Sequence, residues 1–115
     1  MIHLYMDDYR RKPEGFVLAR TIDECMDLLE QEKVDILSLD YDLGWGEPNG
    51  LETVRRLLMG NRFPRKIYLH SSSIAGRKVM YEALYGALPE SVELYMHPVP
   101  DALMDEIASK GAQGK

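Results

Sequence analysis

The sequence predicts an α/β protein in which helices flank a five-stranded parallel sheet. Three observations support this fold class. Short apolar runs alternate along the chain with stretches whose apolar residues recur at helical spacing. Residues 34–40 ("VDILSLD") are apolar at most positions, as is typical of a strand that is buried on both faces. The length of 115 residues fits a single domain, 1–115, with one core.

The predicted strands are apolar runs rich in Ile, Val, Leu and Tyr, bounded by Asp, Gly and Pro. They cover residues 1–6, 16–20, 34–40, 66–73 and 91–97. The segment "DYRRKPEG" between the first two strands is shorter than the roughly 10–12 residues that a helical crossover needs. A loop or a single turn therefore joins these strands, and the first helix of the fold is reduced or absent.

Four segments predict helices: 22–33, 51–60, 75–88 and 100–111. Thr21 followed by Glu24 forms a capping-box pattern at the start of the first helix. Gly60 and Gly111 are typical helix ends. Residues 111–115 are expected to form a frayed tail.

Composition excludes several classes of protein. The net charge of −5 argues against binding to duplex nucleic acid, which depends on many contacts from Lys and Arg to phosphates. No apolar run reaches the roughly 18 residues of a membrane-spanning helix, and the strand-like start leaves no room for a signal peptide. We therefore expect a cytoplasmic protein. The lone Cys25 is expected to be a buried thiol, because it falls within a helical pattern and has no partner for a disulfide.

Polar side chains lie at or just beyond the carboxyl ends of four of the predicted strands. These residues are Asp7 and Asp8, Asp40 with Asp42 beyond it, His70 with Ser71 and Ser72, and His97 before Pro98. In an open parallel sheet, ligands bind outside the carboxyl ends of the strands where the strand order reverses. The sequence therefore predicts a functional site at this edge.

The aspartates predict a magnesium site. Carboxylates that converge on one edge repel one another unless a cation lies among them, and oxygen ligands favour a hard ion such as Mg²⁺. We expect its ligands from Asp7, Asp8, Asp40 and Asp42. The alternative for the first pair is that it only ends a strand and begins a turn.

These motifs make the chain resemble the receiver domain of response regulators, the CheY-like fold. The matching stretches are "YMDDYR", "ILSLDYDLGWGEPNGLE", "IYLHSSS" and "LYMHPVPDAL". The resemblance implies a flavodoxin-like sheet in the order 2-1-3-4-5. It also implies that Asp8 and Asp40 bind Mg²⁺ with the backbone carbonyl of Asp42. Asp40 would be the phosphoacceptor, and Ser71 would contact the phosphoryl group.

The sequence departs from that family in three ways. The helix after the first strand is missing or nearly so, and the loop after Asp40 is longer and carries Trp45. His97 stands where the family has a lysine. A histidine ordinarily titrates near neutrality and can move a proton, which suits catalysis better than fixed charge pairing. We expect His97 to face the acidic edge, with Pro98 fixing the turn, and a cis His97–Pro98 bond is one hypothesis.

The chain more closely resembles a variant group of receiver-like domains that is proposed to process cyclic phosphates. That resemblance implies His97 and His70 as acid and base, with Ser71, Ser72 and Arg77 near the phosphate. Trp45 could stack on a base, or it could pack against the domain. His70 could equally be a core histidine, and Arg77 a solvated surface charge.

Three functions therefore stay open. The chain could be a Mg²⁺-dependent cyclic phosphoesterase acting on a small phosphorylated ligand. It could instead be a signalling domain that a partner kinase phosphorylates on Asp40. As a third alternative, it could be a degenerate receiver that only binds another protein.

Overall fold

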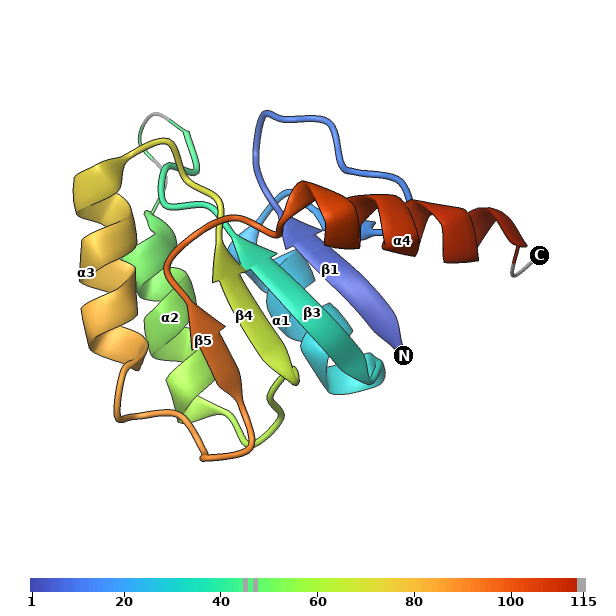
Figure 1. Ribbon diagram of the computed structural model, residues 1–115. Coiled ribbons are helices and arrows are strands. Elements are labelled where there is room, and N and C mark those ends of the chain that lie inside the picture. Colours follow the sequence, from blue (N-terminus) through green and yellow to red (C-terminus); the bar gives the residue numbers. More distant parts are fainter. Residues whose placement is uncertain (45, 47, 114–115) are drawn as a thin grey trace.

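A computed structural model describes residues 1–44, 46 and 48–113, with the side chains of 111–113 excepted. Five parallel strands form one sheet in the order β2-β1-β3-β4-β5, which confirms the predicted fold and strand order (Figure 1). The strands are β1 (Ile2–Met6), β2 (Val17–Ala19), β3 (Val34–Leu39), β4 (Lys66–Leu69) and β5 (Glu93–Tyr95). The helices are α1 (Ile22–Gln31), α2 (Gly50–Met59), α3 (Ile74–Leu84) and α4 (Asp101–Gln113).

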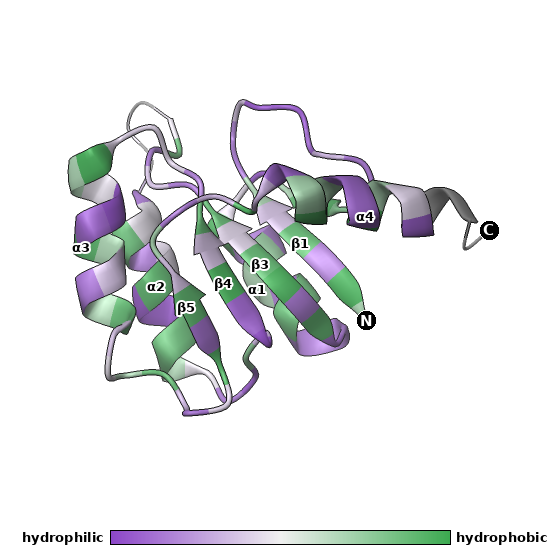
Figure 2. Ribbon diagram, viewed as in Figure 1, coloured by the Kyte–Doolittle hydropathy of each residue, from purple (hydrophilic) through white to green (hydrophobic). Residues whose placement is uncertain are grey.

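Helices cover the sheet unequally. In Figure 1, α1, α2 and α3 lie behind the sheet, and α4 crosses its front near the carboxyl end of β1. Residues 7–16 form a loop rather than a helix, as the short connection predicted. Figure 2 shows this loop in purple, in contrast to the green bands of β3 and β4. Most of this loop is polar, and Phe16 at its end is buried on the front face.

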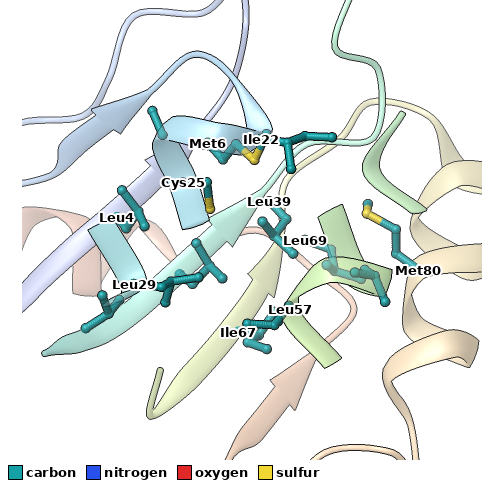
Figure 3. Close-up of a cluster of buried hydrophobic side chains, with 14 of the residues drawn as sticks. Leu4, Met6, Ile22, Cys25, Leu29, Leu39, Leu57, Ile67, Leu69 and Met80 are labelled. Carbon is teal, nitrogen blue, oxygen red and sulfur yellow. The ribbon is translucent and has the colours of Figure 1, made fainter. Parts of the chain in front are cut away.

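The main core lies between the sheet and the three helices behind it. Alternate strand residues such as Leu4, Leu39 and Leu69 meet helix residues such as Cys25 and Leu57 (Figure 3). Burying a leucine of this kind fully stabilises the fold by about 1.5–3 kcal/mol. Burial also raises the pKa of the Cys25 thiol to about 12, so the thiol stays protonated, as expected for a structural cysteine.

A smaller core lies on the front face. Tyr5, Phe16 and Ile36 are buried there, together with Ile107 of α4. Gly15 has a φ of +86°, and a Cβ added at this residue would lie 2.7 Å from Cγ2 of Ile107. Glycine therefore lets the loop before β2 approach α4 closely.

Side chains cap the three rear helices at their amino ends. Thr21 accepts a hydrogen bond from the Glu24 amide, which confirms the predicted capping position. Asn49 caps α2 in the same way, and Ser73 caps α3. Strand β4 ends at Leu69, earlier than predicted, because the chain turns toward α3 after it. The turn is held by a hydrogen bond from the Ser73 amide to Oγ of Ser71.

Other boundaries differ from the predictions at chain turns. Helix α3 ends at Leu84 instead of residue 88, ahead of Gly86, which has a φ of +81°. Strand β5 has three residues and ends at Tyr95, because the chain bends at residues 96–97. Helix α4 continues through Gly111 to residue 113, since glycine inside a helix costs only about 1 kcal/mol. The His97–Pro98 bond is trans, so the cis hypothesis was wrong.

Among the described residues, no helix is both long enough and apolar enough to cross a membrane.

Candidate functional site

The strand register builds the site. The last paired residues of three neighbouring strands form one row across the sheet: Met6, Leu39 and Leu69. The next residue of each strand is Asp7, Asp40 and His70, respectively. One carboxylate oxygen of each aspartate and a ring nitrogen of His70 all lie within 4.8 Å of one another. All three residues are buried, so their polar groups must satisfy one another or a ligand.

Asp7 is held firmly as a carboxylate. Its Oδ1 accepts hydrogen bonds from the amides of Tyr9 (2.9 Å) and Arg10 (2.8 Å), and its Oδ2 lies 3.0 Å from Nε2 of His70. Burial acts to raise the pKa of Asp7. The two amides and His70 outweigh burial, so the pKa lies below its ordinary value. Asp7 is therefore ionised at neutral pH.

Asp40 experiences the opposite balance. Burial raises its pKa first, and the charge of Asp7 raises it further. Hydrogen bonds from the Tyr41 amide (2.8 Å) and the Ser71 hydroxyl favour the ionised form but do not cancel these effects. A cation between the two carboxylates would remove the repulsion.

His70 lies between the acidic edge and the sheet. Its Nδ1 lies 2.6 Å from Oγ of Ser38 on β3, and its ring stacks on Tyr5 with centroids 4.1 Å apart. Burial lowers the pKa of His70 to about 4, and the nearby Asp7 only partly opposes this effect. The imidazole is therefore neutral at pH 7.

Arginines lie around the same edge. Nη1 of Arg10 donates to the backbone oxygen of His70 (3.1 Å), and its Nε lies 4.0 Å from Oδ2 of Asp7. Arg20 donates to the backbone oxygen of Asp7 (3.3 Å), and Arg77 donates to that of Ser71 (2.7 Å). These contacts bring guanidinium groups, which bind phosphoryl oxygens well, to the site.

His97 lies apart from this group but on the same face of the sheet as His70. Its exposed ring packs at an angle on Tyr68 and Tyr95, with centroid separations of 5.8 and 5.5 Å. Its Nδ1 lies 2.8 Å from the backbone oxygen of Pro98. Its backbone oxygen accepts from the amide of Leu69, so His97 lies beside the end of β4. The structure does not place it against the carboxylates.

The other predicted site residues are less closely involved. Ser71 is buried beside Asp40. Asp8 is half-buried, and Asp42 and Ser72 are exposed. Neither Asp8 nor Asp42 belongs to the buried acidic group that the described residues form. Trp45 lies outside the described residues, so its predicted stacking role stays a prediction.

Three further residues contribute to the site, and the sequence predicts them only as parts of strands. They are Tyr5, Arg20 and Ser38. The predicted burial of β3 on both faces could have suggested Ser38, because a serine in a doubly buried strand needs a buried partner. No sequence signal pointed to Tyr5 or Arg20.

Comparison with family models identifies the domain. The model of the cyclic-phosphate processing receiver domain matches residues 2–86. The chain belongs to this family. In this cyclic-phosphate processing receiver domain, the match contains Asp7, Asp40 and His70 but ends before β5 and His97. Comparison with curated proteins gives no match.

The donor set at the edge suits a hard cation. Asp7 and Asp40 offer carboxylate oxygens, which Mg²⁺ prefers to nitrogen or sulfur. Burial, and after it the charge of Asp7, raise the pKa of Asp40, and a cation between the two carboxylates would oppose both effects. Asp7 and Asp40 are therefore the residues that could hold Mg²⁺.

Proposed function

We propose that this domain hydrolyses a cyclic phosphate with the help of Mg²⁺ held by Asp7 and Asp40. One observation carries the proposal: two buried carboxylates converge at the carboxyl edge of a receiver fold whose family processes cyclic phosphates. A bound Mg²⁺ would neutralise charge on the phosphoryl oxygens and make a bound water more acidic.

The residues of the chain would bind the phosphate and move protons. Arg10 and Arg77 lie beside the group and supply guanidinium donors for the remaining phosphoryl oxygens. In the reaction, the oxygen of water bonds to phosphorus and one ester P–O bond of the ring breaks. The proton that water loses ends on the ribose oxygen released from phosphorus. The product is therefore a ring-opened phosphomonoester.

We assign proton transfer to His97. His97 packs on Tyr68 and His70 on Tyr5, and these two tyrosines belong to the same front-face core. Among the described residues, only Nδ1 of the exposed His97 ring has a hydrogen-bond partner. Nε2 of His97 is therefore available to a substrate that extends from the carboxylates across β4. A general acid or base of this kind contributes about 10²–10⁴-fold to a rate.

Phosphorus NMR tests the proposal directly. The purified protein is incubated with Mg²⁺ and a 2′,3′-cyclic nucleotide, and the ring-phosphate resonance is followed over hours. We expect ring opening that stops in Asp40→Asn and falls at least 100-fold in His97→Ala. His3→Gln is the matched control, because His3 lies in β1 away from the acidic edge and should leave the rate unchanged.

The same experiment separates the alternatives. Ring opening that persists in His97→Ala would remove His97 from the chemistry while leaving the metal site intact. If no ring opens, the hydrolysis proposal fails. In that case, incubation with a small phosphodonor shows whether Asp40 becomes phosphorylated, which the adjacent Ser71 hydroxyl would support.

A further inference from the structure

Ser38 and His70 form a buried chain of hydrogen bonds that ends on Asp7. Ser38 is fully buried in the middle of the sheet, and its Oγ lies 2.6 Å from Nδ1 of His70. The other ring nitrogen, Nε2, lies 3.0 Å from Oδ2 of Asp7. The Tyr5 ring stacks almost parallel to the imidazole, at an interplanar angle of 8°, so the His70 ring is fixed in orientation as well as position.

Donor and acceptor roles in this chain follow from Asp7. Oδ1 of Asp7 already accepts two backbone amides, as an ionised carboxylate does. An ionised carboxylate can only accept, so Nε2 of His70 must carry the proton that lies between them. In a neutral imidazole the other nitrogen is then bare, and it accepts the hydroxyl proton of Ser38.

We propose that Ser38 is a positioning residue that holds His70 as the Nε2–H tautomer, through which His70 fixes the Asp7 carboxylate for the cation. Nδ1 of His70 then accepts from Ser38 and Nε2 donates to Asp7, so neither ring nitrogen is free to bind the metal. This inference rests on the proposed metal site and deepens it, because it explains how one of the two ligands is oriented. Partners of this type commonly change metal affinity about 10–100-fold when they are removed.

Nitrogen NMR of the imidazole rings tests the tautomer without metal or substrate. The three histidines are assigned by comparison with His3→Gln and His97→Gln. We expect Nδ1 of His70 to give the resonance of an unprotonated nitrogen and Nε2 that of a protonated one. A protonated Nδ1 would overturn the proposal, whether or not the protein binds Mg²⁺.

Substitution of Ser38 tests the positioning. Ser38→Ala should shift the Nδ1 resonance and weaken Mg²⁺ binding, measured by calorimetry, about 10-fold or more. Thr53→Val is the matched control: Thr53 is also a fully buried hydroxyl residue, but its Oγ1 contacts the sulfur of Met6 at 3.8 Å instead of His70.

The outcomes separate this inference from the proposed function. If Ser38→Ala binds Mg²⁺ as tightly as the Thr53→Val control, Ser38 has no positioning role and the inference is wrong. If the wild type binds no Mg²⁺, the proposed function fails, and the NMR pattern of His70 still decides the tautomer. If Ser38→Ala does not fold, the wild-type nitrogen spectrum alone decides the tautomer, and Ser38→Cys, which offers only a weak S–H donor to Nδ1, replaces it in the calorimetry.

Discussion

At the scale of single residues, the two aspartates of the site have opposite electrostatic environments. Asp7 receives two amides and a histidine, which keep its pKa low. The pKa of Asp40 is raised, first by burial and then by the charge of Asp7. This asymmetry makes Asp7 the permanent anion of the pair and Asp40 the carboxylate whose ionisation is unfavourable in the folded protein without a cation.

Asp40→Asn should therefore stabilise the metal-free protein. A carboxyl with a raised folded pKa stabilises the fold at acid pH, and that stability is lost as the pH rises through the folded pKa. At pH 7 the charge is unfavourable, and removing it should raise the free energy of unfolding by about 1 kcal/mol. Urea denaturation without metal measures this change.

Added Mg²⁺ should make the wild type more stable than Asp40→Asn. The wild type should gain thermal stability with increasing Mg²⁺, whereas Asp40→Asn should gain little, because binding to the native state alone stabilises a protein by mass action. Asp42→Asn is the control, since Asp42 is exposed and outside the acidic group. A metal-free Asp40→Asn protein that is less stable than the wild type would contradict this electrostatic account.

At the scale of elements, two glycines let α2 and α3 approach the segment that follows Asp40. A Cβ added at Gly50 would lie 2.6 Å from the backbone oxygen of Asp40. One added at Gly76 would lie 2.4 Å from Cγ of Tyr41. Real Cβ atoms do not come this close, so glycine at both helix starts is required by packing. The helices thereby fix the backbone that carries Asp40.

Gly76→Ala should consequently destabilise the protein by about 1–3 kcal/mol, because the added Cβ would lie 2.8 Å from Cβ of Tyr41, which cannot move without the backbone. Thermal unfolding measures the loss. Gly60→Ala is the control, since the atom nearest to its added Cβ is 3.5 Å away. Equal unfolding temperatures for Gly76→Ala and the wild type would show that Tyr41 can give way.

At the scale of the whole molecule, the buried site couples stability to pH. The pKa of His70 is lowered to about 4 by burial, from 6.5 in the unfolded chain. Its contribution to stability is fully present above pH 6.5 and is lost as the pH falls toward 4, because the unfolded chain binds the proton more readily. The carboxyl of Asp40 acts in the opposite direction over the acid range.

The pH dependence of unfolding should show this contribution. Between pH 7 and pH 4, the free energy of unfolding of the metal-free wild type should fall by up to about 3 kcal/mol more than that of His70→Gln. Denaturation with urea at several pH values measures the free energy of unfolding of both proteins. The slopes of these values against pH are compared, because the substitution also removes packing and so changes the absolute stability. Parallel pH profiles for the two proteins would exclude His70 as the titrating group.

The sequence by itself determined the fold and the place of the site. Alternating apolar runs and helical spacings specify parallel strands, and the short segment before Phe16 excludes a full helix. Polar residues directly after β1, β3 and β4 must meet at one edge, because parallel strands end on the same side of a sheet. Local sequence therefore sufficed to select Asp7, Asp40 and His70 as members of the candidate set.

Only the tertiary structure decided which candidates act together. At a strand end, alternation no longer fixes direction, so the sequence could not tell whether Asp7 or Asp8 points inward. It also could not show that His70 contacts Tyr5 and Ser38 while His97 packs on Tyr68 and Tyr95. These choices depend on which side chains the register and the helices bring into contact, and contacts between distant segments are not encoded in any single stretch of sequence.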